Sequence, residues 1–246
     1  MRLVSLNIWK GKVLQPLTYF LKEYADKTDI FCFQEIVKDK KDLVSSDGDF
    51  VVYPKVREIL GDFNDCFENH PPAPHVNRHD ITIFTRKNIE VQNKGDILTF
   101  FPEGGDEFIS KDFFWRNMHY IQFTQNSKKF TIANFHGLWD GPGKDDNSRR
   151  LDQSKKVREF MDTIPGHKIL IGDFNIWPDT ESLKILEDGM VNLIEIHNIH
   201  STRSRFVEFP NKYSDYALVS PDIKVNDFKV LDYSISDHLP LYLDFE

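Results

Sequence analysis

HKILIGDFN, His167 to Asn175, is the stretch that most directly indicates how this chain folds. Its apolar run, residues 169–171, predicts a short buried strand, because a helix with the same burial needs a longer pattern. A buried strand needs no polar residue at its end, yet Asp173 and Asn175 follow this one directly. A carboxylate beside a carboxamide suits a hard cation together with a phosphate oxygen, and Gly, Asp and Asn equally suit a plain turn.

The tetrapeptide GDFN occurs twice, at residues 61–64 and at residues 172–175. The motif alone is therefore weak evidence for a site. The residues before the first copy, 57–60, are a mixture of polar and apolar types and do not predict a buried strand, so we interpret that copy as a loop. Only the second copy follows an apolar strand, and we expect Asp173 rather than Asp62 to reach a site.

Patterns typical of strands and helices continue in both directions from this strand. Residues 2–9 and 29–33 predict buried strands, and apolar residues at helical spacing between Leu14 and Tyr24 predict a helix. The other predicted strands are residues 50–53, 81–86, 91–100, 113–123, 130–136, 213–220, 223–231 and 239–245, and the other predicted helices are residues 144–164 and 183–186. We expect the run of strands between residues 81 and 136 to be antiparallel.

Strands outnumber helices in this pattern, and both ends of the chain contribute strands. The pattern therefore favours an α/β fold of two mainly antiparallel sheets packed face to face with helices outside, rather than one doubly wound sheet. The chain has 246 residues, of which 40% are hydrophobic and 21 are Phe, which is enough for a substantial core. Because the pattern contains no repeat or linker, we expect one domain over residues 1–246.

Charge and cysteine content limit the classes of protein to which the chain can belong. A formal net charge of −8 argues against nonspecific coating of duplex nucleic acid, although local basic patches remain compatible with it. Two cysteines, Cys32 and Cys66, do not make a disulfide framework and fit a reducing compartment. The sequence shows neither a signal-peptide pattern nor an apolar stretch of membrane-spanning length. We expect a soluble, cytoplasmic monomer without stable membrane insertion.

Polar residues end several of the predicted strands, at positions where packing of a hydrophobic core does not require them. Each has a structural explanation by itself, such as a turn cap, a solvated strand end or a satisfied core histidine. Taken together they favour a shared cleft, because strand ends on one side of a layered α/β fold converge. The set comprises Asn7, Glu35, His136, Asp173, Asn175, Asp215, Asp237 and His238.

Three oxygen-bearing members of this set suit a magnesium site. Glu35 and Asn7 offer oxygen ligands to an ion that keeps several of its waters. Asp237 can add a ligand or help to fix the site. These three residues are therefore the predicted metal-site residues.

The remaining members suit acid–base chemistry and stabilisation of a phosphoryl group. His238 titrates near neutral pH, and Asp215 is a carboxylate that can hold its tautomer. Asp173 can orient or deprotonate a water, while Asn175 and His136 can donate hydrogen bonds to phosphoryl oxygens. No serine, cysteine or threonine lies in a nucleophile-elbow pattern, which favours water as the nucleophile. These residues support metal-assisted hydrolysis of a phosphate ester.

Six motifs follow one another along residues 3–240. They are LNIW with Asn7, FQE with Glu35, NFHG with His136, GDFN with Asp173 and Asn175, SDYALVS with Asp215, and SDHLP with Asp237 and His238. In this order they resemble the motifs of the endonuclease/exonuclease/phosphatase superfamily, which includes deoxyribonuclease I-like nucleases and neutral sphingomyelinases. The resemblance implies a four-layer α/β/β/α sandwich, dependence on Mg²⁺ or Mn²⁺, and hydrolysis of phosphodiesters or phosphomonoesters.

The resemblance also implies a role for each matching residue. It makes Asn7 and Glu35 metal-site residues, Asp173 and Asn175 positioning residues for the nucleophile and the phosphate, and Asp215 the partner of His238. Histidine rather than tyrosine in NFHG is closer to the deoxyribonuclease I and sphingomyelinase branches than to the exonuclease III branch. Some branches pair this histidine with an acid at the start of a central strand, and Asp80 is the candidate for that role.

Loops beyond these motifs hold the candidates for substrate recognition. Trp139 either stacks on a substrate group or covers the cleft structurally, and the same two interpretations apply to Trp177. Lys144 is a candidate phosphate contact. Arg203 and Arg205 either clamp a second phosphate or belong to a solvated surface.

Two further groups of residues are interpreted as ordinary surface. Arg149 and Arg150 lie on the presumed outer face of the helix over residues 144–164. The proline-bearing segment 61–79 carries His70, His75 and His79, but without the spacing of metal ligands.

Three functions remain open at this point. The short, acidic chain best fits a hydrolase of phosphodiesters. Its substrate would be a nucleotide, a single-stranded or terminal nucleic acid, or a similar ester. A lipid or inositol phosphate phosphodiesterase or phosphatase is the enzymatic alternative, against which stands the lack of an obvious hydrophobic insertion loop. A phosphate-binding module that has lost turnover is the non-enzymatic alternative, and the retention of every metal and histidine residue argues against it.

Overall fold

Two six-stranded sheets form the centre of the molecule. The computed structural model describes residues 1–38, 51–66, 81–101, 115–141, 143–207 and 212–246. One sheet has the strand order β11-β12-β1-β2-β4-β3, and the other has the order β5-β6-β7-β8-β10-β9. The strands are β1 (Arg2–Asn7), β2 (Ile30–Gln34), β3 (Phe63–Asp65), β4 (Thr82–Arg86), β5 (Val91–Phe100), β6 (Arg116–Gln125), β7 (Lys128–His136), β8 (His167–Asp173), β9 (Val191–Asn192), β10 (Asp215–Val219), β11 (Val225–Val230) and β12 (Leu241–Phe245).

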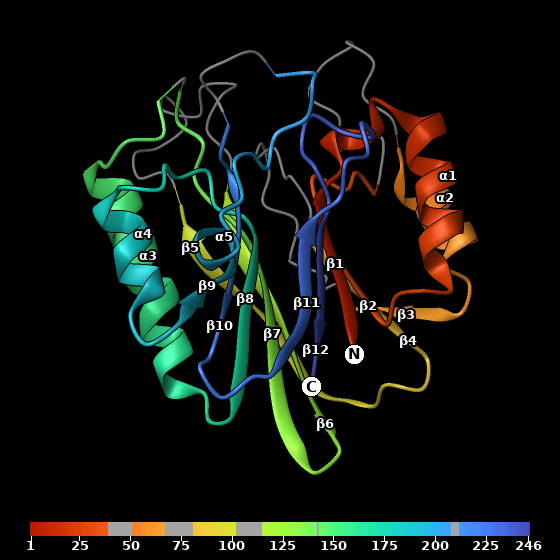
Figure 1. Cartoon of the computed structure of the whole chain (residues 1–246), viewed down its shortest axis with the longest axis horizontal. Coiled ribbons are helices and arrows are strands. Elements are labelled where there is room, and N and C mark those ends of the chain that lie inside the picture. The colour runs from red at the N-terminus through yellow and green to blue at the C-terminus, as the bar shows by residue number, and fades with distance from the viewer. Residues whose placement is uncertain (39–50, 67–80, 102–114, 142, 208–211) are drawn as a thin grey trace.

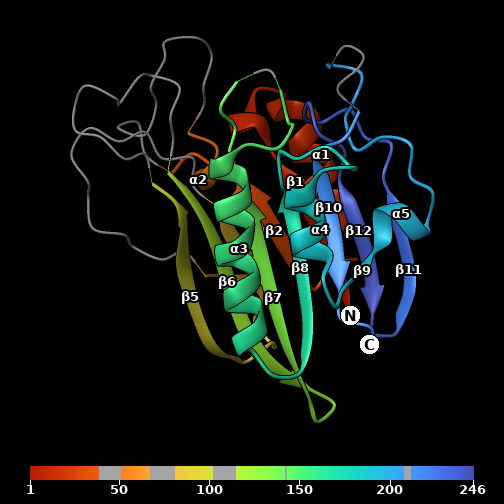
Figure 2. The ribbon, with the colours of Figure 1, turned by 90° about the vertical axis from the view of Figure 1, so that its left-hand side faces the viewer.

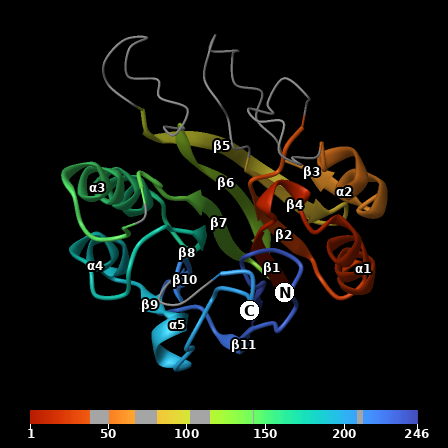
Figure 3. The ribbon, with the colours of Figure 1, turned by 90° about the horizontal axis from the view of Figure 1, so that it is seen from above.

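Helices cover the outer faces of both sheets. On the β1–β2 side lie α1 (Leu14–Ala25) and α2 (Tyr53–Ile59), and on the β7–β8 side lie α3 (Ser148–Thr163) and α4 (Glu181–Glu187) (Figure 1, Figure 3). Figure 2 shows α3 running along the sheet that contains β6, β7 and β8. A short helix, α5 (Leu193–Ile196), follows β9. The predicted α/β/β/α sandwich is therefore confirmed. Within the described residues, no helix is both long and apolar enough to cross a membrane.

Apolar side chains fill the space between the layers. Between the sheets, the rings of Phe130 in β7 and Phe245 in β12 meet edge to face with centroids 5.5 Å apart. Under α1, the buried residues Phe20 and Leu17 pack with Phe31 of β2 in a second cluster. Burial of large aromatic and aliphatic side chains on both faces of a sheet is what holds such layers together.

One buried amide ties the two sheets to each other. Nδ2 of Asn134, in β7, donates to the carbonyl oxygens of Phe33 and Thr82, at 3.0 Å each. Its Oδ1 accepts from Nε2 of Gln34 at 2.6 Å. Because all three partners belong to β2 and β4 of the opposite sheet, this side chain adds directional hydrogen bonds to the apolar packing between the sheets.

Parallel pairing brings the polar strand ends to one edge. β1 and β2 run parallel, with Asn7 opposite Gln34, and β7 and β8 run parallel, with His136 opposite Asp173. β10 runs antiparallel to β8 and begins with Asp215 opposite Asp173. These strand ends therefore gather at the edge of the sheets that lies at the top in Figure 1.

Most predicted elements are confirmed with small shifts at their ends, but residues 50–53 are not a strand. Residues 51 and 52 are irregular, residue 50 lies outside the described residues, and Tyr53 begins α2. The two adjacent valines favoured a strand, whereas Pro54 in the first turn of α2 is compatible with a helix. Val56, buried one turn after Val52, follows the helical period.

The first GDFN copy was interpreted as a loop, and this is wrong for part of it. Phe63–Asp65 forms β3, which pairs with β4 at the edge of its sheet. Phe63 is buried against Phe31, with ring centroids 5.5 Å apart. A strand of three residues is too short to show alternation in the sequence. The short elements β9 and α5 escaped prediction for the same reason.

We predict that Asn134→Leu lowers the free energy of unfolding by about 2–4 kcal/mol. The substitution keeps the volume but leaves two carbonyls and one amide of the opposite sheet without their partner. Urea unfolding followed by circular dichroism measures the loss. Asn93→Leu is the control, because Asn93 is exposed and, in the part of the chain described, its side chain hydrogen-bonds only the side chain of Gln122, at 2.8 Å. Equal, small effects of the two substitutions would contradict the role given to Asn134.

Candidate active site

A buried carboxylate, Asp173, accepts hydrogen bonds from residues of both sheets. Its Oδ2 accepts from Nδ2 of Asn7 at 3.0 Å and from Nδ2 of Asn175 at 3.3 Å. Its Oδ1 accepts from the backbone N–H of Asn175 at 3.1 Å and from the hydroxyl of Ser214. Asp173 is only 2% exposed, so these donors replace the water that an ionised carboxylate needs.

The residue types of GDFN follow from the tight backbone at the end of β8. Gly172 has φ +144°, and a Cβ there would lie 2.1 Å from the carbonyl oxygen of Phe135. Asn175 has φ 54°, in the left-handed region that asparagine tolerates better than most residues. The glycine therefore permits close approach to β7, and the asparagine turns its side chain back toward Asp173.

Two histidines flank this carboxylate. Nε2 of His238 and Nε2 of His136 each lie 3.6 Å from Oδ2 of Asp173. On the other side of its ring, His238 donates from Nδ1 to Asp215, at 2.8 Å from Oδ2 and 3.0 Å from Oδ1. This bond fixes the tautomer of His238 and directs its Nε2 toward Asp173.

Burial and neighbouring charges set the ionisation of these groups. Burial opposes the charged form of Asp173, but His238 and His136 outweigh it and hold the pKa of Asp173 well below its usual range. Burial also lowers the pKa of His238, yet the Asp215 carboxylate reverses this effect and the net shift is upward. For Asp215, burial raises the pKa despite the adjacent His238. The structure thus combines a firmly ionised acid, Asp173, with a basic imidazole.

A cleft of about 350 Å³ opens over these residues. Its lining combines five cations with three carboxylates, Glu35, Asp173 and Asp237. The cations are Lys10, Lys12, Arg116, Lys144 and Arg203. Although the chain carries a net charge of −8, this cleft is locally basic and suits an anionic substrate.

Two arginines line the cleft, Arg203, which the sequence predicted as a candidate, and Arg116, which it did not. Arg203 donates from Nη2 to Oδ2 of Asp237 at 2.6 Å, and its Nη1 contacts the ring nitrogens of His238. Arg116 is 3% exposed and donates from Nε to the carbonyl of Gly137 at 2.7 Å. Burial lowers the pKa of Arg116 to about 10, against the opposing effect of Glu35. The only signal in the sequence was an arginine inside a strand pattern, which indicates no partner.

Buried Lys144 also points into the cleft, where the sequence predicted a phosphate contact. Its Nζ donates to the carbonyl of Tyr213 at 2.8 Å and lies 5.7 Å from the ring centroid of Trp177. Burial lowers the pKa of Lys144 to about 8, and Asp173 opposes this shift. The predicted helix over residues 144–164 begins only at Ser148, because residues 143–147 form the loop that presents Lys144.

Arg150 holds this loop in place, so its assignment to the solvated surface is wrong. It is 3% exposed, and it donates to the carbonyls of Gly143 at 2.8 Å and Asp145 at 2.7 Å and to Oδ1 of Asp140 at 2.5 Å. The helical period could not distinguish it from Arg149, which is exposed as predicted. These hydrogen bonds of Arg150 hold the loop in which Trp139, 41% exposed, lines the cleft.

The predicted metal residues carry oxygen atoms of the type that suits a hard divalent cation. Glu35 lines the cleft with φ 56°, a conformation uncommon outside glycine and asparagine. Oδ1 of Asn7 accepts from the backbone of Trp9 at 3.0 Å, and one oxygen of Asp237 is already paired with Arg203. Carboxylate and carboxamide oxygens are the donors that Mg²⁺ and Mn²⁺ prefer.

A different trio also has metal-binding geometry. Ligand atoms of Asp173, Asp215 and His238 all lie within 4.8 Å of one another. Within this trio, Nδ1 of His238 is already hydrogen-bonded to Oδ2 of Asp215 at 2.8 Å. The assignment of Glu35, Asn7 and Asp237 as metal-site residues stays a prediction.

Other predicted residues lie outside the cleft lining or outside the described residues. Arg205 is exposed beyond the lining, with its guanidinium carbon 5.5 Å from the ring centroid of Phe206. Asp62, in the first GDFN copy, is exposed and also absent from the lining. Asp80 and the histidines of segment 67–80 lie outside the described residues.

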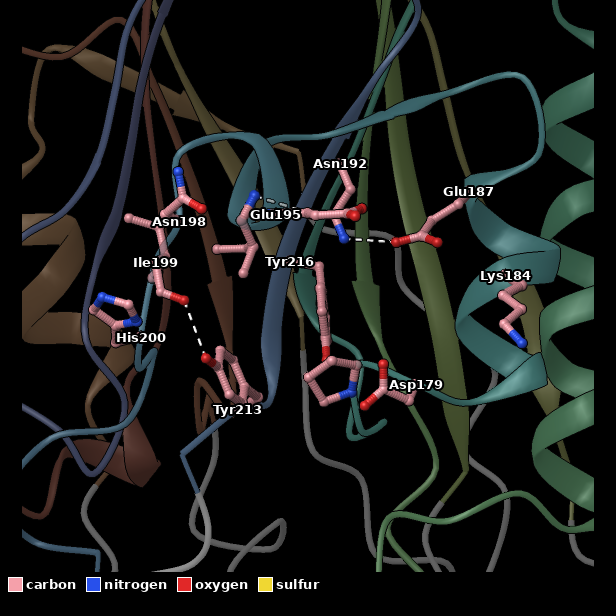
Figure 4. A pocket seen from close by; sticks show the side chains of 12 residues that line it. Asp179, Lys184, Glu187, Asn192, Glu195, Asn198, Ile199, His200, Tyr213 and Tyr216 are labelled. Carbon is pink, nitrogen blue, oxygen red and sulfur yellow. Dashed lines mark hydrogen bonds between the residues drawn. The ribbon is translucent and has the colours of Figure 1, made fainter.

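A second cavity, of about 430 Å³, lies beside α4 and α5 (Figure 4). Three carboxylates line it, those of Asp179, Glu187 and Glu195, and burial raises the pKa of Glu187. Lys184 is its one lysine or arginine among the residues described. An acidic lining repels phosphate, so the basic cleft is the candidate site for a phosphate ester.

Comparisons with known proteins agree with this geometry. The sequence model described as Endonuclease/Exonuclease/phosphatase family matches residues 4–238. Mannosyl-6-phosphatase Bt3783 of Bacteroides thetaiotaomicron is similar in structure, with 18% identity, a TM-score of 0.72, and coverage of 100% of this chain and 99% of that chain. TDP2 of D. rerio, solved with a single-strand DNA product, gives 15% identity, a TM-score of 0.72, and coverage of 100% and 98%. No relative is found among curated proteins.

We predict that Lys144→Met removes a pH-dependent contribution to stability. An unfolded chain keeps the lysine proton up to pH 10.5, whereas the folded chain releases it near pH 8, so the free energy of unfolding rises with pH between these values. The wild type should gain up to about 3 kcal/mol relative to the variant across this window. Urea unfolding at several pH values, with EDTA present, measures the difference.

Lys22→Met is the matched control, because Lys22 is an exposed lysine of α1. It should keep the pH dependence of the wild type. If both variants keep that dependence, Lys144 does not carry the charge penalty derived from its burial.

Proposed function

This chain belongs to the endonuclease/exonuclease/phosphatase family, and on that premise we propose that it is a metal-dependent hydrolase of a phosphodiester in a nucleic-acid end, a nucleotide or a similar ester. The observation that carries this proposal is the arrangement at the floor of a basic cleft, where Asp215 is hydrogen-bonded to Nδ1 of His238 at 2.8 Å and Nε2 of His238 lies 3.6 Å from Asp173. We treat residues 1–246 as one domain, since β12 near one end of the chain pairs with β1 near the other.

Water is the proposed nucleophile, and two groups of this chain are suited to move its proton. Asp173 carries a carboxylate that stays ionised near neutral pH, which suits it to orient or deprotonate a water. Nε2 of His238 lies 3.6 Å from that carboxylate, and Asp215 stabilises the imidazolium that forms when Nε2 takes up a proton. In the proposed step Asp173 orients the water and Nε2 of His238 takes its proton, while the water oxygen bonds to phosphorus and the P–O bond to the leaving group breaks, the leaving oxygen keeping the electron pair.

Hydrogen-bond donors are available for the charge that builds on the phosphoryl oxygens. Asn175 and His136 lie beside Asp173 at the floor of the cleft, and Arg203 and Lys144 add positive charge to its lining. Donors fixed before the reaction stabilise a developing charge without reorganisation. Trp139, on the braced loop, is placed to contact the organic part of the ester.

Glu35 and Asn7, with Asp237, would hold Mg²⁺ or Mn²⁺ at this cleft. When bound, such an ion supplies positive charge against the phosphoryl group. The protein contributes the ligands and their orientation: Asn7 is held by its bond of 3.0 Å to Asp173, and Glu35 by the local backbone.

The test uses the two copies of GDFN as a matched pair. Asp173→Asn should lower the hydrolysis of bis(4-nitrophenyl) phosphate with Mg²⁺ or Mn²⁺ by at least about a thousandfold, because it removes the ionised acid. Asp62→Asn, the same change in the same tetrapeptide, should leave the rate unchanged. We expect His238→Ala to lose activity on the same scale. Full activity in His238→Ala, or equal effects of the two aspartate changes, would refute the mechanism.

A panel of esters then assigns the substrate class. We expect the highest kcat/KM on single-stranded DNA ends or 5′-tyrosyl DNA, compared with abasic duplex DNA, sphingomyelin, inositol phosphates and mannose 6-phosphate. The reason is the cleft's combination of cations with Trp139. Turnover confined to lipid or sugar phosphates would overturn the assignment while leaving the hydrolytic mechanism intact, and a chain with no turnover on any ester is a binding module.

A further inference from the structure

A turn at the rim of the cleft holds a tryptophan in an unusual backbone conformation. Trp9 has φ 48°, Lys10 has φ 52° and Gly11 has φ +74°, three consecutive residues with positive φ. Bulky side chains rarely adopt this region, and where they do the surrounding structure imposes it. Here Asn7 accepts from the backbone of Trp9 at 3.0 Å, and Gly11 leaves room for Val52, which a Cβ would approach to 2.9 Å.

The consequence of this turn is that Trp9 and Lys10 both line the cleft. Asn7, which holds the turn, also donates to Asp173 at 3.0 Å. The position of the indole ring is therefore coupled to the carboxylate at the floor. A straight continuation of β1 would instead carry Trp9 away along the strand direction.

Phe206, from a distant part of the chain, completes an aromatic surface with Trp9. Their ring centroids are 6.1 Å apart with an interplanar angle of 39°. Phe206 is 42% exposed and Trp9 is partly exposed, so neither ring is buried in the core. An aromatic pair that stays open beside a cleft is available to stack on a ligand.

Cations lie on this surface as well. Nζ of Lys12 is 4.8 Å from the centroid of Trp9, and the guanidinium carbon of Arg205 is 5.5 Å from the centroid of Phe206. Both basic residues are exposed. Adjacent exposed rings with a cation beside each are suited to bind an unpaired base together with its neighbouring phosphates. A single sugar phosphate could stack on one of the rings, but it has no further phosphates to contact Lys12 and Arg205.

We propose that Trp9 and Phe206 form a stacking subsite for an unpaired base of a single-stranded nucleic acid, and that Lys12 and Arg205 contact its neighbouring phosphates. The subsite deepens the proposed function and rests on it, because the base would lie next to the phosphate held in the cleft. Duplex nucleic acid is a poor fit, since its bases are paired and stacked and present no free face to the rings.

Fluorescence anisotropy of the full-length protein in EDTA tests the subsite without turnover. The probes are a fluorescein-labelled thymidylate hexamer and an abasic hexamer with the same phosphates. We expect Phe206→Ala and Trp9→Ala each to weaken thymidylate binding about tenfold, with little change for the abasic probe. Trp9→Phe should keep most of the affinity, because the ring persists. Tyr19→Ala, an exposed aromatic of α1 that is not part of the cleft lining, should change nothing.

Each contrary result identifies what fails. Equal losses on the thymidylate and abasic probes, or no loss in either aromatic variant, would overturn the stacking subsite. Displacement of both probes by mannose 6-phosphate at its own binding concentration would assign the rings to a sugar and also overturn it. Hydrolysis of bis(4-nitrophenyl) phosphate, measured separately, would still support the proposed function, so failure of the subsite is distinguishable from failure of the enzyme.

Discussion

The burial of one charged carboxylate, Asp173, is the constraint on which the site depends. An ionised group without water is costly unless several donors and cations surround it. Asp173 finds them in Asn7 of the opposite sheet, in Asn175 and in the hydroxyl of Ser214. Because those donors come from separate segments, the carboxylate is stable only when both sheets are correctly packed, and the amide of Asn134 adds directional hydrogen bonds to that packing deeper in the core.

Net charge and local charge have different meanings in this molecule. The chain is acidic overall, yet its candidate active site collects cations, while the neighbouring cavity collects carboxylates. Two cleft cations, Arg116 and Lys144, are buried and hydrogen-bonded to backbone carbonyls, which holds them in place before any substrate arrives. A net charge of −8 therefore lowers the expectation of nonspecific DNA binding without excluding a phosphate site.

Much of the fold could be predicted from the sequence, because strand and helix periods are local properties. The exceptions have local causes too. Val51 and Val52 suggested a strand just before α2, and the three residues of β3 are too few to show a period. Arg149 and Arg150 are adjacent on α3, and the 100° step between neighbouring residues of a helix turns one to solvent and the other to the loop it braces.

The sequence by itself determined which residue types end the strands, and with them the family. Only the tertiary structure decided which of them meet. Two copies of GDFN have the same letters, but Asp173 of one lies beside His238, whereas Asp62 of the other is exposed near a sheet edge. Trp9 and Phe206 are far apart in the chain and become neighbours in space. The physical reason is that periodicity records burial along one element, whereas contacts between elements depend on strand order and on the packing of two sheets.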